Sequence, residues 1–145
     1  MNVVKEISVK LENKPGALSE LSELLSADGI CIVALTVRTA GGEGMASFVA
    51  TDPERAANIL ESGALAPGVR EVLAAEIPQH PGGLNAILKS LKQAGVNIEY
   101  LYSCVGPHAA GNGTVIMLAV DNTAAAHDAL SREWIRLHGE ELYRF

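Results

Sequence analysis

One six-residue pattern occurs twice in the chain at a fixed spacing. Residues 13–18 read Asn-Lys-Pro-Gly-Ala-Leu and residues 79–84 read Gln-His-Pro-Gly-Gly-Leu, so the proline and the leucine of the second copy follow their counterparts by 66 positions. A segment of alternating apolar and polar residues leads into the first copy, and apolar residues at helical spacing follow both copies. A repeat at a constant period predicts two similar structural units along the chain.

Each proline–glycine pair is predicted to begin a helix, at Pro15 and at Pro81. Proline suits the first helical position because its missing N–H would have had no partner there. The glycine that follows leaves the backbone uncovered, the first-turn amides of a helix lack intrahelical partners, and the helix dipole favours an anion beside them. Each turn is therefore a candidate site for a small carboxylate or phosphate. The alternative is an ordinary strand-to-helix turn with nothing bound.

The chain has 145 residues, which suits two small units that we place at residues 1–68 and 69–145. Units of this size bury little surface on their own, so the halves are expected to share a core or an interface. With 48% hydrophobic and 19% charged residues, the composition is that of a packed globule and excludes a disordered chain.

The charge and the cysteines restrict the partners and the compartment. The formal net charge of −6 argues against nucleic acid and against an anionic membrane surface as the partner, and only 4% of the residues are aromatic. Cys31 and Cys104 lie in apolar, strand-like runs and are predicted to be buried thiols of a reduced protein. The first residues form no apolar leader, and no apolar run reaches membrane-span length. These features predict a cytoplasmic protein.

The periodicities predict the order strand-helix-strand-strand-helix-strand, written twice. This is the ferredoxin-like pattern, so the predicted fold class is α+β with two βαββαβ units and antiparallel sheets. The predicted strands are 3–12, 30–39, 45–51, 69–78, 96–105, 114–120 and 139–145, and the predicted helices are 15–28, 53–62, 81–94 and one that begins near residue 123.

Single residues carry further predictions within this pattern. Glu6 is placed on a polar outer face of the first strand, and Asp52 is predicted to cap the second helix. Gly29 and Gly95 are predicted to be left-handed residues that end helices. Trp134, near the end of the last helix, is predicted to anchor the core or an interface.

The segment between the second helix and the second turn has room for about one strand, where two independent units would need two. Either the strand at 69–78 is long and serves both units, or residues 139–145 cross over to complete the first sheet. We therefore expect a shared or exchanged strand, which would make the two halves inseparable.

The sequence offers no set of residues that could perform catalysis or bind a metal. The four histidines are not at metal-ligand spacing with one another or with a cysteine. No nucleophile, base and orienting residue can be assembled, and the glycine-rich stretches at 41–44 and 111–113 are hairpin connections and not phosphate loops. We predict no enzymatic activity, no metal and no cofactor. The histidines are His80, His108, His127 and His138.

On these two turns, each followed by a helix, a glycine and a β-rich strand, the chain resembles the ACT domain family, and most closely its stand-alone tandem members. The resemblance implies a ferredoxin-like unit that binds an amino acid between the first turn of one unit and the second strand of a neighbouring unit. It implies that backbone amides of the turn hold the carboxylate, with Asn13 as a candidate partner of the ammonium group. The second copy departs from the family pattern at Gln79 and His80, so its site is either degenerate or suited to another ligand. The candidate ligand-binding residues are Asn13, Lys14, Pro15, Gly16, Ala17, Leu18, Gln79, His80, Pro81, Gly82, Gly83 and Leu84 in the turns, with Leu35 and Tyr100 on the second strands.

The function that this resemblance implies is a non-catalytic amino-acid sensor. The antiparallel sheet edges and the apolar second strands predict that it acts as a homodimer. The alternative is a regulatory subunit that docks onto a separate enzyme of amino-acid metabolism. An enzyme on the same fold is disfavoured by the missing catalytic residues. An RNA-binding module with this topology is disfavoured by the acidic charge.

Overall fold

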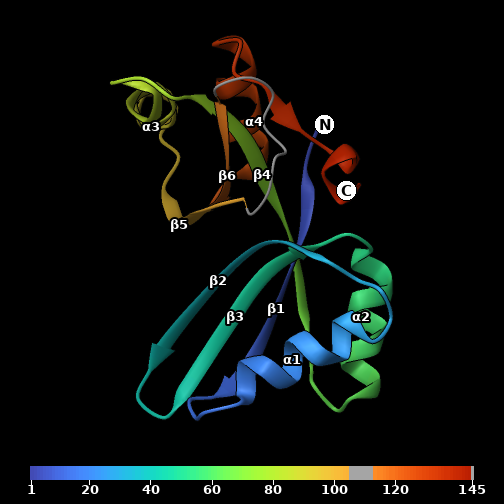
Figure 1. Cartoon of the computed structure of the whole chain (residues 1–145). Helices are drawn as coiled ribbons and strands as arrows, with labels where there is room; N and C mark the ends of the chain where they lie inside the picture. The colour runs from blue at the N-terminus through green and yellow to red at the C-terminus, as the bar shows by residue number, and fades with distance from the viewer. Residues whose placement is uncertain (105–112, 145) are drawn as a thin grey trace. The chain divides into compact units, whose positions relative to one another are not determined.

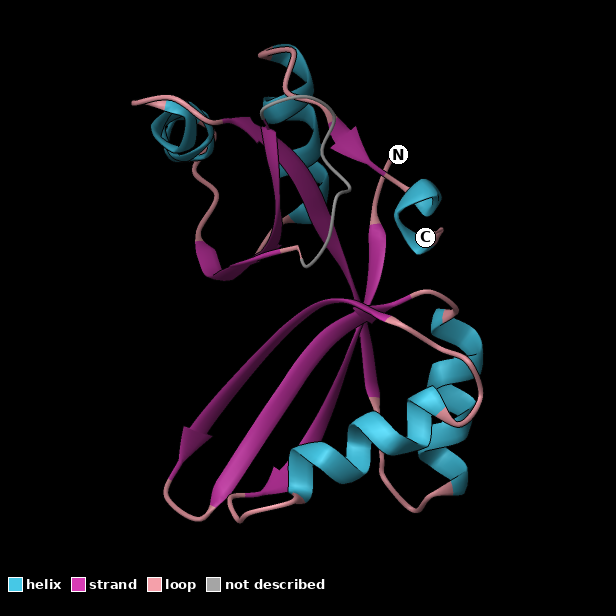
Figure 2. Cartoon of the chain, in the orientation of Figure 1, coloured by secondary structure: helices cyan, strands magenta, loops and turns pink. Residues whose placement is uncertain are grey.

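The computed structural model describes residues 1–104 and 113–144, so the predictions for the loop at 106–112, for His108 and for Phe145 lie outside the described residues. Figures 1 and 2 show how helices and strands alternate along the chain. In chain order the elements are β1 (Val4–Glu12), α1 (Ala17–Ser26), β2 (Ile32–Ala40), β3 (Glu43–Ala50), α2 (Pro53–Ser62), β4 (Gly68–Pro78), α3 (Gly83–Gln93), β5 (Ile98–Ser103), β6 (Gly113–Val120), α4 (Thr123–Arg132), β7 (Leu137–His138) and a short 3-10 helix (Glu140–Tyr143).

The chain divides into two compact units, and one strand serves both. The N unit consists of Lys5–Arg70 with Tyr143 and Arg144, and the C unit consists of Met1–Val4 and Glu71–Leu142. β4 begins in the N unit and ends in the C unit, so the predicted sharing of the strand at 69–78 is observed. The boundary between residues 68 and 69 stays a prediction about where the repeat divides.

In the N unit a three-stranded antiparallel arrangement packs its apolar face against two helices. β3 pairs with β1 and with β2, and Phe48 at its centre faces Ile7 on one side and Leu35 on the other. Because successive strand residues point to opposite faces, Ala46, Phe48 and Ala50 all reach the side that α1 and α2 cover. The buried cluster is Ile7, Val9, Leu21, Leu25, Ile30, Ala46, Phe48, Ala50, Ala56 and Leu60.

The C unit repeats this arrangement. β6 pairs antiparallel with β4 and β5, so that Leu118 faces Leu73 and Leu101, while β7 pairs antiparallel with the other edge of β4. Leu73 and Leu118, which are fully buried, each contribute about 1.5–3 kcal/mol relative to an exposed position. The buried cluster is Leu73, Ala75, Ile87, Leu91, Val96, Ile116, Leu118, Val120, Ala126, Leu130 and Leu137.

The predicted signals for helix boundaries are largely confirmed. Asp52 accepts a hydrogen bond from the backbone N–H of Arg55, at 3.2 Å, and α2 begins at Pro53. Gly29 and Gly95 adopt left-handed backbone conformations, with φ of 73° and 72°, after α1 and α3. These positions depend on local chemistry alone, which is why sequence reasoning finds them.

Three predictions about exposure and one about a strand are wrong. Glu6 is fully buried because β1 has hydrogen-bonded neighbours, β3 and β4, on both edges. Cys31 is exposed because it precedes β2 and only its backbone is held, by Thr51. Trp134 is 95% exposed, so the prediction that it anchors the core is wrong, while the interface alternative stays a prediction. Within the described part of the predicted last strand, residues 139–144, there is no strand, since β7 ends at His138 and the following acidic segment forms a short 3-10 helix.

Candidate functional site

The two turns share one backbone conformation, and it differs from the predicted one. Gly16 and Gly82 are the N-cap residues of α1 and α3, with φ of 90° and 89°. The helices therefore begin at Ala17 and Gly83, and the prediction that Pro15 and Pro81 occupy the first helical position is wrong. The physical reason is that a left-handed residue cannot continue into a right-handed helix, so each helix begins after its glycine.

The first helical amides in both turns lack a side-chain cap. Neither N-cap glycine has a side chain that could accept a hydrogen bond, and helical bonding starts when Glu20 and Ala86 donate to the carbonyls of Gly16 and Gly82. Among the amides that precede those donors, Ala17 and Gly83 donate to the carbonyls of Lys14 and His80 within the turns. The next two amides of each helix project from its end, which carries partial positive charge. Leu18 and Leu84, in these uncapped first turns, are equally exposed, at 40%. An anion therefore has access to both helix ends.

The first turn is tied to the β2–β3 hairpin. Asn13 donates from its backbone N–H to Gly42 O, at 3.0 Å, and from its side-chain Nδ2 to Gly41 O, at 3.2 Å. Lys14 Nζ lies 3.1 Å from a carboxylate oxygen of Glu12, and this hydrogen bond and charge raise the pKa of Lys14. Since Nδ2 of Asn13 is used, its Oδ1 is the atom that remains to accept a hydrogen bond from a ligand.

The second turn is tied to β6 and is more tightly packed. Gln79 Nε2 donates to Thr114 Oγ1, and His80 Nδ1 lies 2.9 Å from Pro81 O. A Cβ at Gly83 would lie 2.3 Å from Pro78 O, so this position admits only glycine. The first turn has a buried alanine, Ala17, at the same position and therefore has room for a Cβ.

A pocket lies at the second turn. This turn pocket has a volume of about 420 Å³ and is lined by Ile77, Pro78, Gln79, His80, Pro81 and Leu84. The structure thus brings together four of the predicted site residues, Gln79, His80, Pro81 and Leu84, around one hollow. A pocket of this volume is within the range of small-molecule sites, roughly 300–1,000 Å³.

The second-strand residues do not line the turn pocket. Leu35 is half-buried and packs against the core of the N unit. Tyr100 is half-buried and stacks on Tyr102, with ring centroids 6.3 Å apart and ring planes at 17°. Their contribution to a ligand site stays a prediction.

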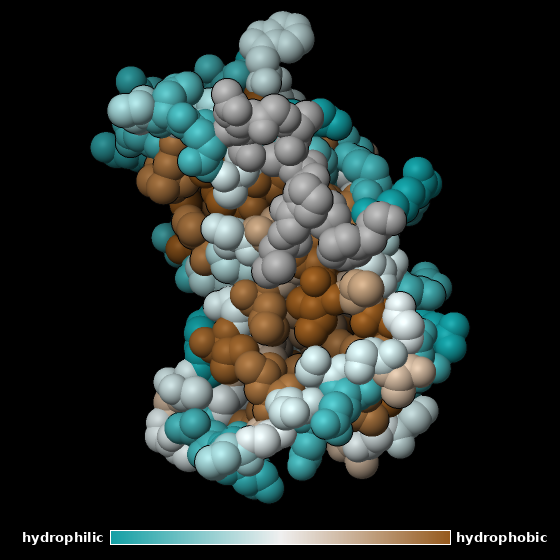
Figure 3. Space-filling view, viewed as in Figure 1, coloured by the Kyte–Doolittle hydropathy of each residue, from teal (hydrophilic) through white to brown (hydrophobic). Residues whose placement is uncertain are grey.

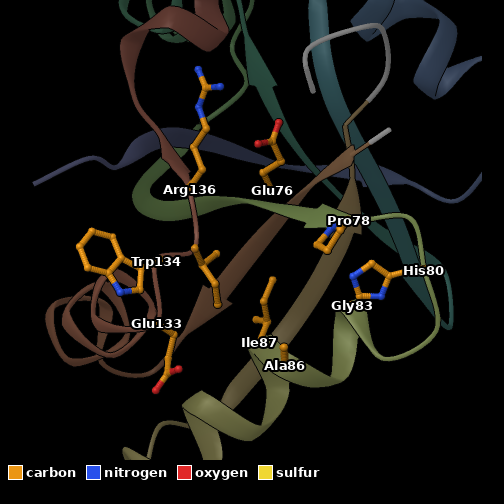
Figure 4. Close-up of a pocket in the computed structure, with 10 residues that line it drawn as sticks. Glu76, Pro78, His80, Gly83, Ala86, Ile87, Glu133, Trp134 and Arg136 are labelled. Carbon is orange, nitrogen blue, oxygen red and sulfur yellow. The ribbon is translucent and has the colours of Figure 1, made fainter. Parts of the chain in front are cut away.

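A larger pocket in the C unit was not predicted from the sequence. This Trp134 pocket has a volume of about 530 Å³, and Figure 4 shows it between the end of β4, the start of α3 and the segment after α4. Trp134 itself could have been noticed, because α4 ends there without the glycine that usually follows a helix. The lining residues are Glu76, Pro78, His80, Gly83, Ala86, Ile87, Glu133, Trp134, Ile135 and Arg136.

Within residues 1–104 and 113–144, no group of three or more metal-ligating side chains is close enough to hold a metal ion. No helix in the same ranges is both long enough and apolar enough to cross a membrane. His138 is buried with Nδ1 3.4 Å from Glu141 and Nε2 3.8 Å from Glu76, so it belongs to a side-chain cluster at the end of β7.

Comparisons with known proteins agree with this architecture. The sequence matches the family described as ACT domain pair over residues 1–141. No curated protein gives a significant match. Protein BT0572 from Bacteroides thetaiotaomicron has a similar crystal structure, with a TM-score of 0.90 and 29% sequence identity over 99% of this chain and 97% of that one.

Two more distant structures share the fold. The regulatory subunit of aspartate kinase from Thermus thermophilus, in a ligand-free form, has a TM-score of 0.65 and 15% identity over 91% of this chain and 93% of its own. The regulatory subunit of aspartate kinase from Thermus flavus has a TM-score of 0.57 and 16% identity over 92% and 97%. At these identities the similarity establishes the fold.

Proposed function

Because the chain belongs to the ACT domain pair family, we propose that it is a non-catalytic regulatory protein of the cytoplasm that binds a free amino acid at its strand-to-helix turns. The observation that carries the proposal is the pair of uncapped helix starts, one of which opens on a pocket. A carboxylate there would accept hydrogen bonds from first-turn amides and interact favourably with the helix dipole.

The side-chain amides supply the matching contact for the ammonium group. Asn13 and Gln79 both donate with their nitrogen to the protein, to Gly41 and to Thr114. This bond fixes the orientation of each amide and leaves the carbonyl oxygen as an acceptor. Each turn therefore combines donors for a carboxylate with one acceptor for an ammonium group, which is the pattern that a zwitterion requires. Leu35 and Tyr100 remain part of the proposal as second-strand residues that contact the ligand.

The first experiment is calorimetric titration of the whole chain with each of the twenty amino acids. We expect saturable binding of at least one, weakened about tenfold or more by Gln79→Ala, since a hydrogen bond to a charged group contributes about 1.5–3 kcal/mol. The matched control is Gln93→Ala, at the exposed far end of α3, the helix that follows the turn. Flat traces with all twenty amino acids would remove the proposal.

We further propose a homodimer whose assembly responds to the ligand. Apolar residues are exposed on the face seen in Figure 3, and Val37 on β2 and Leu101 on β5 are each 41% exposed. Both strands are at the ends of the strand order, where unpaired backbone groups can join a second chain. The ligand can shift the assembly only as far as it binds the two states differently. Sedimentation velocity with and without the bound amino acid measures this shift.

A second possibility is that the protein is the regulatory subunit of a separate enzyme of amino-acid metabolism. The Thermus structures of this fold are named as regulatory subunits of aspartate kinase. Copurification of an enzyme with the tagged chain, and a ligand-dependent change in that enzyme's rate, would favour this reading over a free-standing sensor. Neither reading includes nucleic acid or a membrane as partner.

A further inference from the structure

The turn that ends α4 is the same as the turn that ends α2, although the residues at its centre differ greatly in size. Ala64 and Trp134 have φ of 62° and 59°. Each donates to the third residue before it, at 3.1 Å, and the next residue donates back to the helix from Leu65 to Leu60 and from Ile135 to Leu130. A left-handed residue other than glycine costs roughly 1–2 kcal/mol, and a bulky one is an outlier.

This comparison shows that the fold requires only a small residue at the turn. The N unit meets the requirement with alanine, whereas the C unit holds an indole there with 95% of its surface exposed. Packing within the C unit therefore does not account for the size of Trp134. Strained backbone combined with a solvent-exposed aromatic ring is typical of binding positions.

The Trp134 pocket exists because two strands separate beside this residue. β7 pairs with Ala74 and Ala75 of β4, and the last bond across the gap runs from Glu76 N to Arg136 O at 2.9 Å. Beyond it Pro78 has no N–H to donate, and the chain turns away at Trp134. α3 forms the floor of the resulting gap, and its first residue, Gly83, lies close to Pro78.

The lining combines an apolar floor with Arg136 and two carboxylates, Glu76 and Glu133. Ala86 and Ile87 form the floor, and Figure 4 shows the charged ends of Glu76 and Arg136 on one common side, away from that floor. The Glu76 carboxylate also lies 3.8 Å from His138 Nε2. The Arg136 guanidinium makes no ion pair within 4 Å in the described parts of the chain, so it can receive a carboxylate from a ligand.

We propose that the Trp134 pocket is a second amino-acid site, which adjoins the turn pocket at Pro78 and His80 but lies on the other side toward Trp134, and that it takes an aromatic amino acid. The carboxylate binds Arg136, the ammonium group binds Glu76, and the ring lies between Trp134 and the apolar floor. A guanidinium matches a carboxylate in geometry, and an offset pair of aromatic rings adds about 0.5–1.5 kcal/mol to the burial of their surfaces. A volume of about 530 Å³ accommodates a ligand of this size.

The test uses the fluorescence of Trp134, which is the only tryptophan in the chain. Phenylalanine should cause a saturable blue shift of the emission, because the indole leaves water. Phenethylamine, which lacks the carboxylate, and 3-phenylpropionate, which lacks the ammonium group, should each bind at least tenfold more weakly. Equal affinity for either analogue, or no shift with phenylalanine, would overturn the proposal.

Substitutions in the Trp134 pocket test whether phenylalanine binds there. Arg136→Gln should weaken phenylalanine binding at least tenfold, and the matched control Arg132→Gln, an exposed arginine outside the pocket, should leave it unchanged. If Arg136→Gln unfolds, Ala86→Leu provides a second test, since it fills the pocket from an exposed helix position. Full binding by either folded pocket variant would contradict the assignment.

This outcome is separable from that of the proposed turn site. Gln79→Ala should leave the phenylalanine-induced fluorescence shift intact, whatever it does to the calorimetric signal of another amino acid. Loss of the fluorescence shift in Gln79→Ala but not in Arg136→Gln would assign the aromatic ligand to the turn and refute the second site.

Discussion

The two strand-to-helix turns have the same backbone in different surroundings. Gly16 and Gly82 adopt φ values within a degree of each other, and neither helix start has a side-chain cap. The first turn is held by the hairpin through Asn13 and has Ala17 at the start of its helix. The second has Gly83 pressed against Pro78 and opens on a pocket.

This comparison teaches that the repeat preserves a backbone conformation and leaves the chemistry around it free to change. The left-handed glycine is required wherever a strand turns this abruptly into a helix. The residues that meet a ligand are set by contacts with other elements, which differ between the units.

The two cysteines flank the second strands, Cys31 just before β2 and Cys104 just after β5, and they differ in exposure. Burial raises the pKa of Cys104 to about 11, whereas Cys31 is exposed. Relative to the ordinary value of 9.0, this pKa lowers the thiolate fraction of Cys104 at pH 8 by about 100-fold. Iodoacetamide labelling followed by peptide mass spectrometry should modify Cys31 first, with Cys104 accelerating as the pH rises toward 11. Equal labelling rates of the two cysteines in the native protein would contradict this prediction. Equal labelling rates in urea, where the protein is unfolded, serve as the control.

The residue after each N-cap glycine tests the difference in packing. Gly83→Ala should destabilise the protein by about 1–3 kcal/mol or more, because the new Cβ meets a backbone carbonyl that cannot move aside. The reciprocal change in the N unit, Ala17→Gly, should cost only about 1 kcal/mol through helix propensity. Urea denaturation followed by circular dichroism measures both. A Gly83→Ala protein as stable as the wild type would show that the second turn is not tighter.

The N-cap glycines test what the turns have in common. Gly16→Ala and Gly82→Ala should each cost about 1–2 kcal/mol, since both residues are left-handed and a Cβ at either meets nothing within 4 Å. The same denaturation experiment should give the two variants similar losses, because the two glycines share one backbone conformation and equally open surroundings. Clearly unequal losses would mean that the backbone similarity conceals a difference in strain.

The smallest effect on stability is expected at Lys14, the residue after Asn13. Lys14 pairs with Glu12 at the surface, and we expect Lys14→Met to leave the urea midpoint at pH 7 unchanged, because exposed ion pairs contribute little. The raised pKa of Lys14 means that any stabilisation is present below its unfolded-state pKa and is lost as pH rises through the folded-state pKa. A variant that loses stability at pH 7 and regains it relative to wild type above about pH 11 would show that the pair matters more than its exposure suggests.

Sequence reasoning located most of the elements because they depend on short-range patterns. The alternation before Asn13, the helical spacing of Leu21 and Leu25, and the caps at Asp52 and Gly29 are local properties of the chain, and each lies where it was predicted. The start of α1 was misplaced by two residues because a proline–glycine pair is compatible with either of two glycine conformations. The candidate binding residues of the second turn were found for the same local reason, since they belong to the repeat.

Two of the positions that sequence reasoning missed, Glu6 and Trp134, depend on distant neighbours. Glu6 is buried because strands lie on both of its edges, and Trp134 is exposed because the chain turns away from the sheet at that residue. In both cases the segments responsible are far away in the sequence, so no periodicity around Glu6 or Trp134 could indicate the burial or the exposure.

The sequence alone determined that this protein is a tandem pair of ferredoxin-like units with a repeated glycine turn, because periodicity and turn chemistry act over a few residues. Tertiary structure decided which turn opens on a pocket and where a second pocket forms. Those features depend on how closely Gly83 approaches Pro78 and where β4 separates from β7, and such distances are set only when segments far apart in the chain pack together.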